Sequence, residues 1–425
     1  MIVQKWSDVK LKYIAEINPS KSELLKIDDT EVTFIPMENI LAPGNVDLSI
    51  KKSLADVYNG YTYFKEDDII VAKVTPCFEN GNIAIMEGLS NGIGFGTTEL
   101  YVVRINKNKY NNKFFYYALQ SDEFKKEAIS NMYGVGGLKR IPLEFIRNYK
   151  FKVPQIQVQN KVVEFLSNKT ESIMHLINHK ERLIILLEEK RQSMIIEAVT
   201  KGLNLNVKMK DSGVEWIGEI PEHWDVVKIK RLTSVKRGAS PRPIDNPIYF
   251  DDEGEYAWVR IADVSNSGMY LNRTTQRLSK LGSSLSVKMK PGDLFLSIAG
   301  TVGKPCITNI NCCIHDGFVY FPNFKENIKY LYFIFDSGEP YKGLGKMGTQ
   351  LNLNTDTVGM ISIPVPPKEE QNKIVEFIED QVNELNCLID NIKKQIQKLK
   401  EYRQSLIYEA VTGKIDVREY ELVPQ

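Results

Sequence analysis

Two histidines have the spacing that most suggests metal chemistry. His175 and His179 stand four residues apart in a segment with helical periodicity, and two imidazoles at that spacing can share a zinc ion. A zinc site needs at least three protein ligands, and no third ligand lies near these two. A second copy of the segment, described below, has Cys387 and Asn391 at the matching positions. We therefore interpret the histidines as part of an exposed helix face and predict no metal site.

A glycine-rich loop matches a nucleotide-binding pattern by letter only. Residues Gly343–Gly348 read GLGKMG and fit G-x-G-x-x-G. A dinucleotide site needs a strand before the loop and a helix after it, but the next residues, TQLNLN, are not helical in character. Two interpretations stay open, a simple turn or a loop whose backbone approaches a phosphate. Gly134–Arg140 occupies the matching place in the first half of the chain.

A third motif concerns methyl transfer. Asp245–Tyr249 reads DNPIY and resembles the loop with which amino-methyltransferases hold a flipped base. Ile248 stands where that loop has a second proline, and no glycine-rich motif for the methyl donor lies upstream. We interpret the segment as a turn followed by a strand. The four histidines and five cysteines suggest no nucleophile paired with a base, so we predict no catalytic residues and no bound cofactor.

The elements that position these residues are set by an internal repeat. Residues 153–202 recur as residues 365–414 without a gap, at an offset of 212, with 21 of 50 positions identical. Each copy has apolar residues three and four positions apart, which predicts a long helix with a heptad-like seam. The predicted seam consists of Val162, Leu166, Ile173, Leu176, Ile184, Leu187 and Met194 in the first copy, and of Ile374, Ile378, Leu385, Leu388, Ile396, Leu399 and Leu406 in the second.

The repeat predicts the architecture of the whole chain. Two long antiparallel helices forming a coiled coil would join two globular α/β domains, giving an α+β fold with a pseudo-two-fold tandem repeat. The expected parts are a first globular domain at 1–150, a central helical repeat at 151–202, a linker and second globular domain at 203–360, and a C-terminal helical repeat at 361–425. Two matched helices carrying two divergent domains suggest one scaffold that presents two different readers.

Composition limits the setting and the partners. No run of 18 apolar residues exists and the N-terminal segment lacks the apolar core of a signal peptide, so we expect a cytoplasmic protein without a membrane span. The cysteines show no CxxC spacing and are expected to be free thiols. A net charge of +1 weakens a general argument for nucleic acid, but a local patch matters more than the sum.

The repeats and the linker carry a family resemblance. The helical copies, with Pro366-Pro367, Glu370-Gln371 and the RQS…EAVT ends, are similar to the repeat regions of type I restriction-modification specificity subunits. The linker Asp211–Trp224 resembles that family's entry into its second recognition domain, and Phe64–Met86 and Gly94–Glu99 resemble one subclass of those domains. The resemblance covers essentially the full chain. The first copy departs from the family pattern, with Pro154-Gln155 at the double proline.

The resemblance implies a non-catalytic reader of double-stranded DNA. Each domain would read one half of a bipartite site, and the helices would set an unread spacer between the halves. It further implies two methyltransferase subunits docked on the helices, S-adenosylmethionine bound by those subunits, and restriction subunits that act as translocases. Apolar residues outside the seam support additional helical partners: Phe165, Ile177, Ile185, Leu186, Phe377, Ile389 and Tyr408.

Polar loop side chains are the candidates for DNA contact. Arginine pairs with guanine, asparagine and glutamine pair with adenine, and lysine, serine and threonine bind phosphate. The candidates are Lys73, Thr75, Lys139 and Arg140 in the first domain, and Arg237, Arg242, Lys304, Lys346, Thr349, Gln350, Asn352 and Asn354 in the second. Two other functions stay open at this point. One is a coiled-coil scaffold joining two protein-binding domains, and the other is a self-contained DNA methyltransferase.

Overall fold

The chain divides into two compact units that each combine one globular domain with parts of both long helices. The computed structural model describes residues 6–24, 29–41, 44–135, 137–204, 206–342, 353–417 and 420. The first unit is Met1–Glu181 with Lys393–Gln425, and the second unit is Arg182–Ile392. The sequence predicted four consecutive parts of the chain. In the structure, each compact unit instead combines one globular domain with a segment of both long helices.

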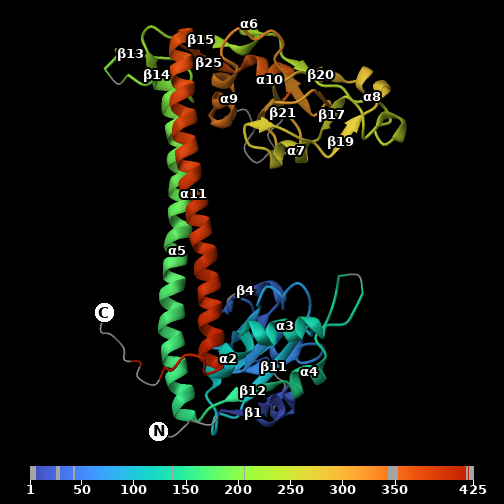
Figure 1. The fold of residues 1–425 in the computed structure, drawn as a ribbon, viewed down its shortest axis with the longest axis vertical. Helices are drawn as coiled ribbons and strands as arrows, with labels where there is room; N and C mark the ends of the chain where they lie inside the picture. Colours follow the sequence, from blue (N-terminus) through green and yellow to red (C-terminus); the bar gives the residue numbers. More distant parts are fainter. Residues whose placement is uncertain are drawn as a thin grey trace. The chain divides into compact units, whose positions relative to one another are not determined.

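Both repeats form the long helices that their periodicity predicts. Helix α5 spans Ile156–Lys201 and α11 spans Lys368–Val411, and the two run side by side in Figure 1. In the first unit they are antiparallel, because Met174 of α5 lies opposite Arg403 of α11, at 3.0 Å, while Lys180, further along α5, bonds Gln395, which lies earlier on α11, at 2.6 Å. In the second unit Arg191 Nη1 of α5 donates to Asn386 Oδ1 of α11 at 3.0 Å. The predicted α+β fold with a long antiparallel helix pair is confirmed.

The buried stripe of each helix repeats every eleven residues. On α11, Ile374, Leu385, Ile396 and Ile407 are all buried, and on α5 the matching stripe runs through Val162, Ile173, Ile184 and Ile195. Eleven residues make three turns at 3.67 residues per turn, which is close to the period of a straight helix. Positions that repeat every seven residues rotate gradually around the axis of a straight helix. A heptad-like register therefore assigns some exposed residues to the seam.

The seam differs from the prediction at one matched pair. Leu176 and Leu388 are each 45 % exposed, whereas the next residues, Ile177 and Ile389, are 2 % and 4 % exposed. The eleven-residue period accounts for this shift of one position. Of the other predicted seam residues, Val162, Leu166, Ile173, Ile374, Ile378, Leu385, Ile396 and Leu406 are buried, while Ile184, Leu187, Met194 and Leu399 are half-buried.

A glycine ends each helix against a tryptophan of the same unit. Gly202 follows α5 with φ +73°, and a Cβ there would lie 2.9 Å from the ring of Trp224. Gly413 follows α11 with φ +75°, and a Cβ there would lie 2.6 Å from the ring of Trp6. The left-handed backbone and the close approach both require glycine. Each helix therefore finishes on the entry strand of a globular domain.

The first globular domain contains two four-stranded sheets. One is mixed with strand order β6-β3-β10-β7, and the other is antiparallel with order β2-β11-β8-β9. A separate ladder pairs the first strand of the domain with its last, β1 with β12. The strands are β1 (Ser7–Lys10), β2 (Ala15–Ile17), β3 (Glu31–Ile35), β6 (Lys51–Ser53), β7 (Thr62–Lys65), β8 (Ile69–Ala72), β9 (Ile83–Ile85), β10 (Ile93–Gly96), β11 (Leu100–Ile105) and β12 (Lys150–Val153).

The second globular domain repeats this topology with one added strand, β18, which pairs in parallel with β22. Its mixed sheet has the order β19-β17-β23-β20, and its other sheet has the order β16-β24-β21-β22-β18. The terminal ladder is β15 with β25. The strands are β15 (Asp225–Lys228), β16 (Lys236–Arg237), β17 (Tyr256–Val259), β18 (Tyr270–Leu271), β19 (Gln276–Leu278), β20 (Val287–Met289), β21 (Leu294–Ser297), β22 (Pro305–Thr308), β23 (Cys312–Ile314), β24 (Phe318–Tyr320) and β25 (Ser362–Val365).

The parallel pair inside each mixed sheet shows the equivalence. Strand β10 runs parallel to β3 and antiparallel to β7, and β23 runs parallel to β17 and antiparallel to β20. Shorter elements connect these strands: β4 (Ile40–Leu41), β5 (Asn45–Val46), α1 (Leu54–Val57), α4 (Leu143–Asn148), β13 (Met209–Asp211), β14 (Glu219–Pro221), α6 (Ile229–Leu232), α7 (Ile261–Asn266), α8 (Lys280–Ser284) and α10 (Thr355–Met360). The linker predicted to lack helical periodicity contains the hairpin β13–β14.

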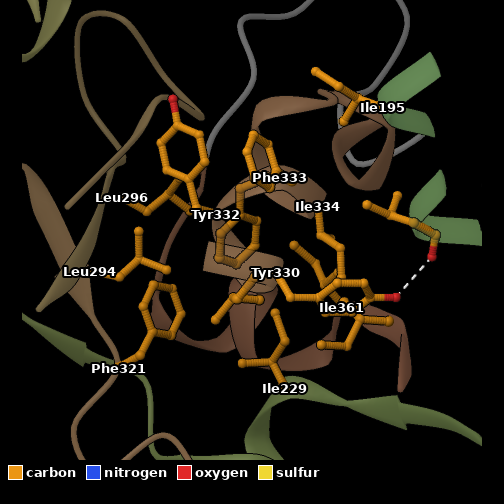
Figure 2. Packing of buried hydrophobic residues seen from close by; sticks show 14 of the residues in the cluster. Ile195, Ile229, Leu294, Leu296, Phe321, Tyr330, Tyr332, Phe333, Ile334 and Ile361 are labelled. Carbon is orange, nitrogen blue, oxygen red and sulfur yellow. Dashed lines mark hydrogen bonds between the residues drawn. The ribbon is translucent and has the colours of Figure 1, made fainter. Parts of the chain in front are cut away.

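An apolar helix joins each sheet to the long helices. In the first unit this is α2 (Asn112–Gln120), followed by α3 (Asp122–Ser130), and in the second it is α9 (Ile328–Asp336). Six consecutive residues of α9, Tyr330–Phe335, are buried, and Figure 2 shows several of them packed among Leu294, Leu296 and Ile195. The Tyr330 hydroxyl donates to the carbonyl of Val199 on α5 at 2.9 Å, so the core includes the end of that helix.

A buried glutamine fixes the start of each long helix to its domain. In the first unit Gln159 Oε1 accepts the backbone N–H of Asn111 at 2.8 Å, and its Nε2 donates to the carbonyl of Pro154 at 2.9 Å. Asn111 also donates through Nδ2 to Asn160 Oδ1 at 2.8 Å. Since Asn111 is the N-cap of α2, one residue ties the start of α2 to the start of α5.

The second unit repeats the hydrogen bonds of this joint and adds one, from Gln371 Nε2 to Glu326 Oε2 at 2.9 Å. Gln371 is fully buried, accepts the N–H of Asn327 at 2.9 Å and donates to the carbonyl of Pro366 at 2.9 Å. Asn327 caps α9 and donates to Asn372 Oδ1 at 2.7 Å. One difference between the two joints is Glu370, which accepts from Trp224 Nε1 at 2.9 Å. Val158 takes the place of Glu370 in the first unit, where it is buried.

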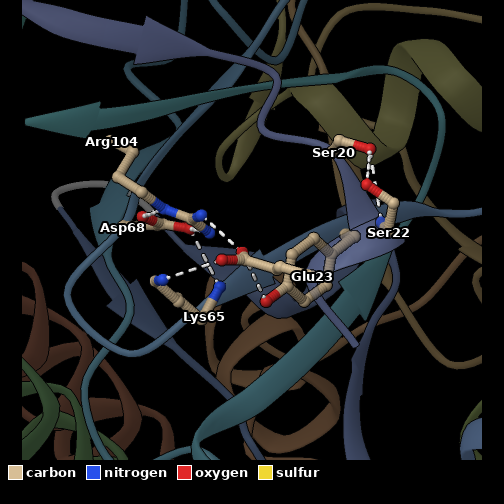
Figure 3. A network of polar contacts seen from close by, with 7 residues as sticks. Ser20, Ser22, Glu23, Lys65, Asp68 and Arg104 are labelled. Atoms are coloured by element: carbon tan, nitrogen blue, oxygen red, sulfur yellow. Dashed lines mark hydrogen bonds and ion pairs between the residues drawn. The ribbon is translucent and has the colours of Figure 1, made fainter. Parts of the chain in front are cut away.

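A charge network stiffens the first domain (Figure 3). Arg104 on β11 donates from Nε and Nη2 to the two carboxylate oxygens of Asp68, at 2.8 and 2.7 Å, and from Nη1 to Glu23 at 2.5 Å. Glu23 also accepts from Tyr63 Oη at 2.9 Å and from Lys65 Nζ at 3.2 Å. Burial opposes ionisation of Glu23, but the bonds from Arg104, Tyr63 and Lys65 prevail and lower its pKa to about 2.

The glutamine joint predicts a matched pair of stabilities. Gln371→Ala removes a fully buried side chain and leaves the half-buried N–H of Asn327 without its acceptor, so it should lower the free energy of unfolding by about 1–3 kcal/mol. Gln397→Ala makes the same chemical change at an exposed position of α11 and should change it by less than about 0.5 kcal/mol. Urea unfolding of the full chain measures both. Equal losses would show that Gln371 makes no special contribution.

The Glu23 network predicts a loss of stability in acid. Its folded pKa of about 2 lies below the ordinary 4.5, so the stabilisation is present above pH 4.5 and is lost as the pH falls towards 2. Solvent screens this partly exposed carboxylate, and the loss should be about 0.5–1 kcal/mol. Urea unfolding at pH 7 and pH 3 should show a smaller difference for Glu23→Gln than for the unchanged chain. The same difference in both chains would contradict the role assigned to Glu23.

Candidate nucleic-acid interface

The four candidate residues of the first domain come together at one place. A hairpin, Tyr133–Arg140, lies against the turn after β8, and Thr75 fixes it there. Thr75 Oγ1 donates to the carbonyl of Gly137 at 2.7 Å and accepts the N–H of Lys139 at 2.9 Å, while the Thr75 N–H donates to the Lys139 carbonyl at 3.0 Å. Thr75 is buried, so in this structure it positions the hairpin.

Lys73 and Arg140 meet at Glu99, which directly precedes β11. Arg140 donates from Nε to Glu99 Oε2 at 3.1 Å and from Nη2 to Oε1 at 2.8 Å. Lys73 Nζ lies 3.9 Å from Glu99 Oε2 and donates to the carbonyl of Thr98 at 2.6 Å. The bonds from Arg140 lower the pKa of Glu99 against the opposing effect of burial, and the charge of Lys73 adds to this. The carboxylate is therefore ionised and holds both cations.

The hairpin carries exposed apolar side chains that the sequence reasoning did not include. Tyr133, Val135 and Leu138 are 63 %, 90 % and 58 % exposed. The glycines near Val135 could have indicated this hairpin from the sequence. Gly134 and Gly137 both have positive φ, a backbone conformation that glycine adopts readily. Lys139 is exposed at the base of the same hairpin. The hairpin thus combines apolar groups with cations.

Two candidates of the second domain also share an acid. Arg237 Nε donates to the carbonyl of Asp316 at 2.5 Å, and Arg242 Nη2 donates to its carboxylate at 3.1 Å. Ser240 Oγ donates to the same carboxylate at 2.9 Å. Burial opposes ionisation of Asp316, but the bond from Ser240 and the two arginine charges lower its pKa. Arg242 keeps 78 % of its side chain exposed.

The two acids occupy equivalent places in the fold. Glu99 directly precedes β11, and Asp316 lies two residues before β24, the strand that takes the position of β11 in the second domain. The arginines come from different segments, since Arg140 follows α3 whereas Arg242 follows β16. Two divergent sequences thus place an acid–arginine pair at the same connection of the same sheet. The sequence analysis did not include Glu99 or Asp316. An acidic residue just before a buried strand could have indicated both positions.

The other candidates of the second domain lie apart from this pair or outside the description. Lys304 Nζ donates to the carbonyls of Ser265 and Ser267, at 2.9 and 3.0 Å. Asn354 caps α10 by accepting the N–H groups of its first turn. Within the described ranges no hydrogen bond or ion pair joins either residue to Asp316. Lys346, Thr349, Gln350 and Asn352 fall outside the described residues, as does the loop Gly343–Gly348.

The remaining motifs are structural. Asn246 caps a single 3-10 turn at Pro247–Tyr249, so the segment is the predicted turn, although the next strand begins only at Tyr256. Cys312 and Cys313 are buried on β23, and burial raises the pKa of their thiols to about 12 and about 11. Such thiols are poor nucleophiles at neutral pH. In the described part of the chain, no three acidic, histidine or cysteine side chains are grouped to hold a metal.

The same part of the chain also has no helix that is long and apolar enough to cross a bilayer.

Comparison with known proteins identifies both halves of the chain. The family described as the type I restriction modification DNA specificity domain matches residues 4–184 and again 221–398. The EcoAI specificity subunit of Escherichia coli is 35 % identical over 224 residues, which are 52 % of this chain and 36 % of that protein. The EcoEI specificity subunit of Escherichia coli is 26 % identical over 93 % of this chain and 80 % of that protein.

Solved structures share the fold along the whole chain. A chain from a study of complex assembly and conformational transition of the type I restriction-modification system superimposes with a TM-score of 0.75, at 18 % identity, over 96 % of this chain and 98 % of its own length. The HsdS subunit of Thermoanaerobacter tengcongensis gives a TM-score of 0.54 at 19 % identity, over 96 % and 97 %.

The two family matches cover both globular domains and most of both long helices, which is well over half of the chain. The duplicated topology and the paired joints agree with them. The chain therefore belongs to the type I restriction-modification DNA specificity family.

Proposed function

We propose that this chain reads DNA for a type I restriction-modification complex and performs no chemistry itself. The observation that carries the proposal is one topology used twice with different loops. The two domains share their sheets, their terminal ladders and their glutamine joints, yet place different side chains beside Glu99 and Asp316. A shared frame with unlike loops suits two unlike half-sites separated by bases that neither domain contacts.

Contact with DNA is assigned to the residues that remain accessible. In the first domain these are Lys139 and Arg140, and in the second domain they are Arg237 and Arg242. Lys73, Thr75 and Lys304 are buried or half-buried and bonded within their own domain, and the exposed Asn354 uses its side chain to cap α10, so we assign these four to holding the loops in position. The candidates of the 343–352 loop keep their predicted role in phosphate or base contact.

The partners are assigned to exposed apolar positions of the long helices. In the first unit Leu176 of α5 is exposed, and in the second unit Leu183, Ile185 and Leu186 of α5 and Leu388 of α11 are exposed, each by 44 to 46 %. Apolar side chains gathered on an otherwise polar helix mark an interaction surface. We assign this surface to two methyltransferase subunits, which would supply S-adenosylmethionine and the methyl transfer, and restriction subunits would join them.

Two other functions have less support. A scaffold joining two protein-binding domains would not need paired arginines on matched sheet connections, and binding of the complex to duplex DNA would be absent. A self-contained methyltransferase would need a site for the methyl donor, and the segment that resembles its base-binding loop forms only a capped turn. Binding of S-adenosylmethionine to the isolated chain would favour that second alternative.

Partner dependence is the first test of the proposal. The pure chain should transfer no labelled methyl groups to DNA, and co-expression with its methyltransferase subunits should restore transfer. Leu186→Glu should weaken assembly roughly tenfold or more, since burial of a leucine contributes about 1.5–3 kcal/mol. Glu188→Ala, at an exposed position two residues away, should leave assembly unchanged. Methylation by the chain alone would refute the non-catalytic role.

Exchange of one globular domain is the second test. Strand β15 pairs with β25 from Asp225 with Val365 to Lys228 with Ser362, so the second domain begins and ends in one ladder. Replacing 225–365 by the equivalent domain of a relative should change one half-site of the methylated motif and leave the spacer and the other half-site as they were. The replacement must keep an asparagine at position 327 to bond Gln371. A change in both half-sites would contradict independent reading.

A further inference from the structure

We propose that Arg140 reads a guanine in the first half-site and that Glu99 is the residue that aims it. This inference rests on the proposed DNA-reading function and names the base that one side chain recognises. Its basis is the way in which the guanidinium is held. Glu99 takes the edge formed by Nε and Nη2, and in the part of the chain that the structure describes no hydrogen bond is made by Nη1.

The open edge of Arg140 has the form that guanine requires. A guanidinium presents two forks, a side fork through Nε and Nη2 and an end fork through Nη1 and Nη2. With the side fork on Glu99, the end fork still offers two parallel N–H groups. Guanine shows two neighbouring acceptors, O6 and N7, in the major groove, and a bidentate arginine is their most common partner. Arg140 is 45 % exposed, so the end fork can reach a ligand.

Arg104 of the same domain shows what a purely structural arginine looks like. Its side fork holds Asp68 in the same bidentate way, but its Nη1 is taken by Glu23 and only 16 % of its side chain is exposed (Figure 3). Both forks are therefore used inside the domain. Arg140 holds Glu99 in the same bidentate way, but no second carboxylate binds its Nη1 in the described part of the chain. Arg104 therefore stabilises the domain, whereas the end fork of Arg140 is directed outward.

The support behind Arg140 is rigid. Lys73 Nζ lies 3.9 Å from Glu99 Oε2, and the backbone N–H of Lys73 donates to the Glu99 carbonyl at 3.0 Å. The Arg140 backbone pairs with Tyr133 in both directions, at 2.8 and 3.1 Å, across the base of the hairpin. A guanidinium held in this way loses little further freedom when it binds, which favours recognition of a flat base edge.

The charge of Glu99 favours a base over a phosphate. A phosphate oxygen beside the guanidinium would also lie near the ionised carboxylate, and the two anions would repel one another. The O6 and N7 atoms of guanine carry no net charge, so the same carboxylate can hold the arginine without opposing the ligand. Exposed Val135 and Leu138 on the same hairpin suit the thymine methyl groups and sugars of a groove wall.

The test replaces Arg140 by lysine in the full complex. Arg140→Lys keeps the charge and loses the fork, so the methylated motif mapped by sequencing should lose its preference for guanine at one position of the first half-site, by roughly 5- to 150-fold. The spacer and the second half-site should stay unchanged. Arg104→Lys is the matched control, because it breaks the same kind of fork inside the domain. It should lower the melting temperature and leave the motif as it was.

Glu99→Gln separates base from phosphate. If Arg140 reads guanine, the loss of its aiming partner should reduce the discrimination at that position. If Arg140 binds phosphate instead, Glu99→Gln removes the repelling carboxylate and should tighten binding to all sequences. Arg140→Lys should then leave the motif intact. Either result would overturn the inference. An unchanged motif and unchanged affinity in both variants would overturn it as well. A wild-type complex that methylates no bipartite motif would refute the proposed function instead.

Discussion

The structure depends on a buried glutamine at the start of each long helix. Gln159 and Gln371 each accept from the asparagine that caps the apolar helix of the adjoining domain and donate to a carbonyl of the approaching chain. A buried amide that lost one of these partners would leave a polar group unpaired, so the joint has one low-energy geometry. The angle between each globular domain and the start of its helix is therefore set by hydrogen bonds as well as by apolar packing.

This joint explains how two domains of divergent sequence keep one frame. To join the long helices, the second domain must keep its terminal ladder, its asparagine cap and the apolar face of α9. Loops at the connection before β11 or β24 are free of these conditions. Sequence can therefore diverge at the connections that carry Glu99 and Asp316 while the frame is preserved, as the matching strand orders of the two domains require.

Prediction from the sequence succeeded where periodicity determines structure. The repeat located both long helices to within a few residues, because apolar spacing and flanking proline and glycine report directly on a helix. The heptad-like register placed Leu176 and Leu388 in the seam, and the eleven-residue period of the buried stripe moves the contact to Ile177 and Ile389. The candidate site was less predictable, because residue type alone does not show that Thr75 and Lys304 are bound inside their own domains.

The pairing of arginines with acids also bears on a chain whose net charge is only +1. Phosphate binding gains free energy by releasing counterions, and an arginine already neutralised by a carboxylate releases few. Glu99 offsets one of the two positive charges of Arg140 and Lys73, and Asp316 offsets one of the two positive charges of Arg237 and Arg242, so each cluster keeps one net positive charge. On the proposed DNA-reading function, each cluster would contribute one net positive charge towards phosphates together with the directional hydrogen bonds of its arginine.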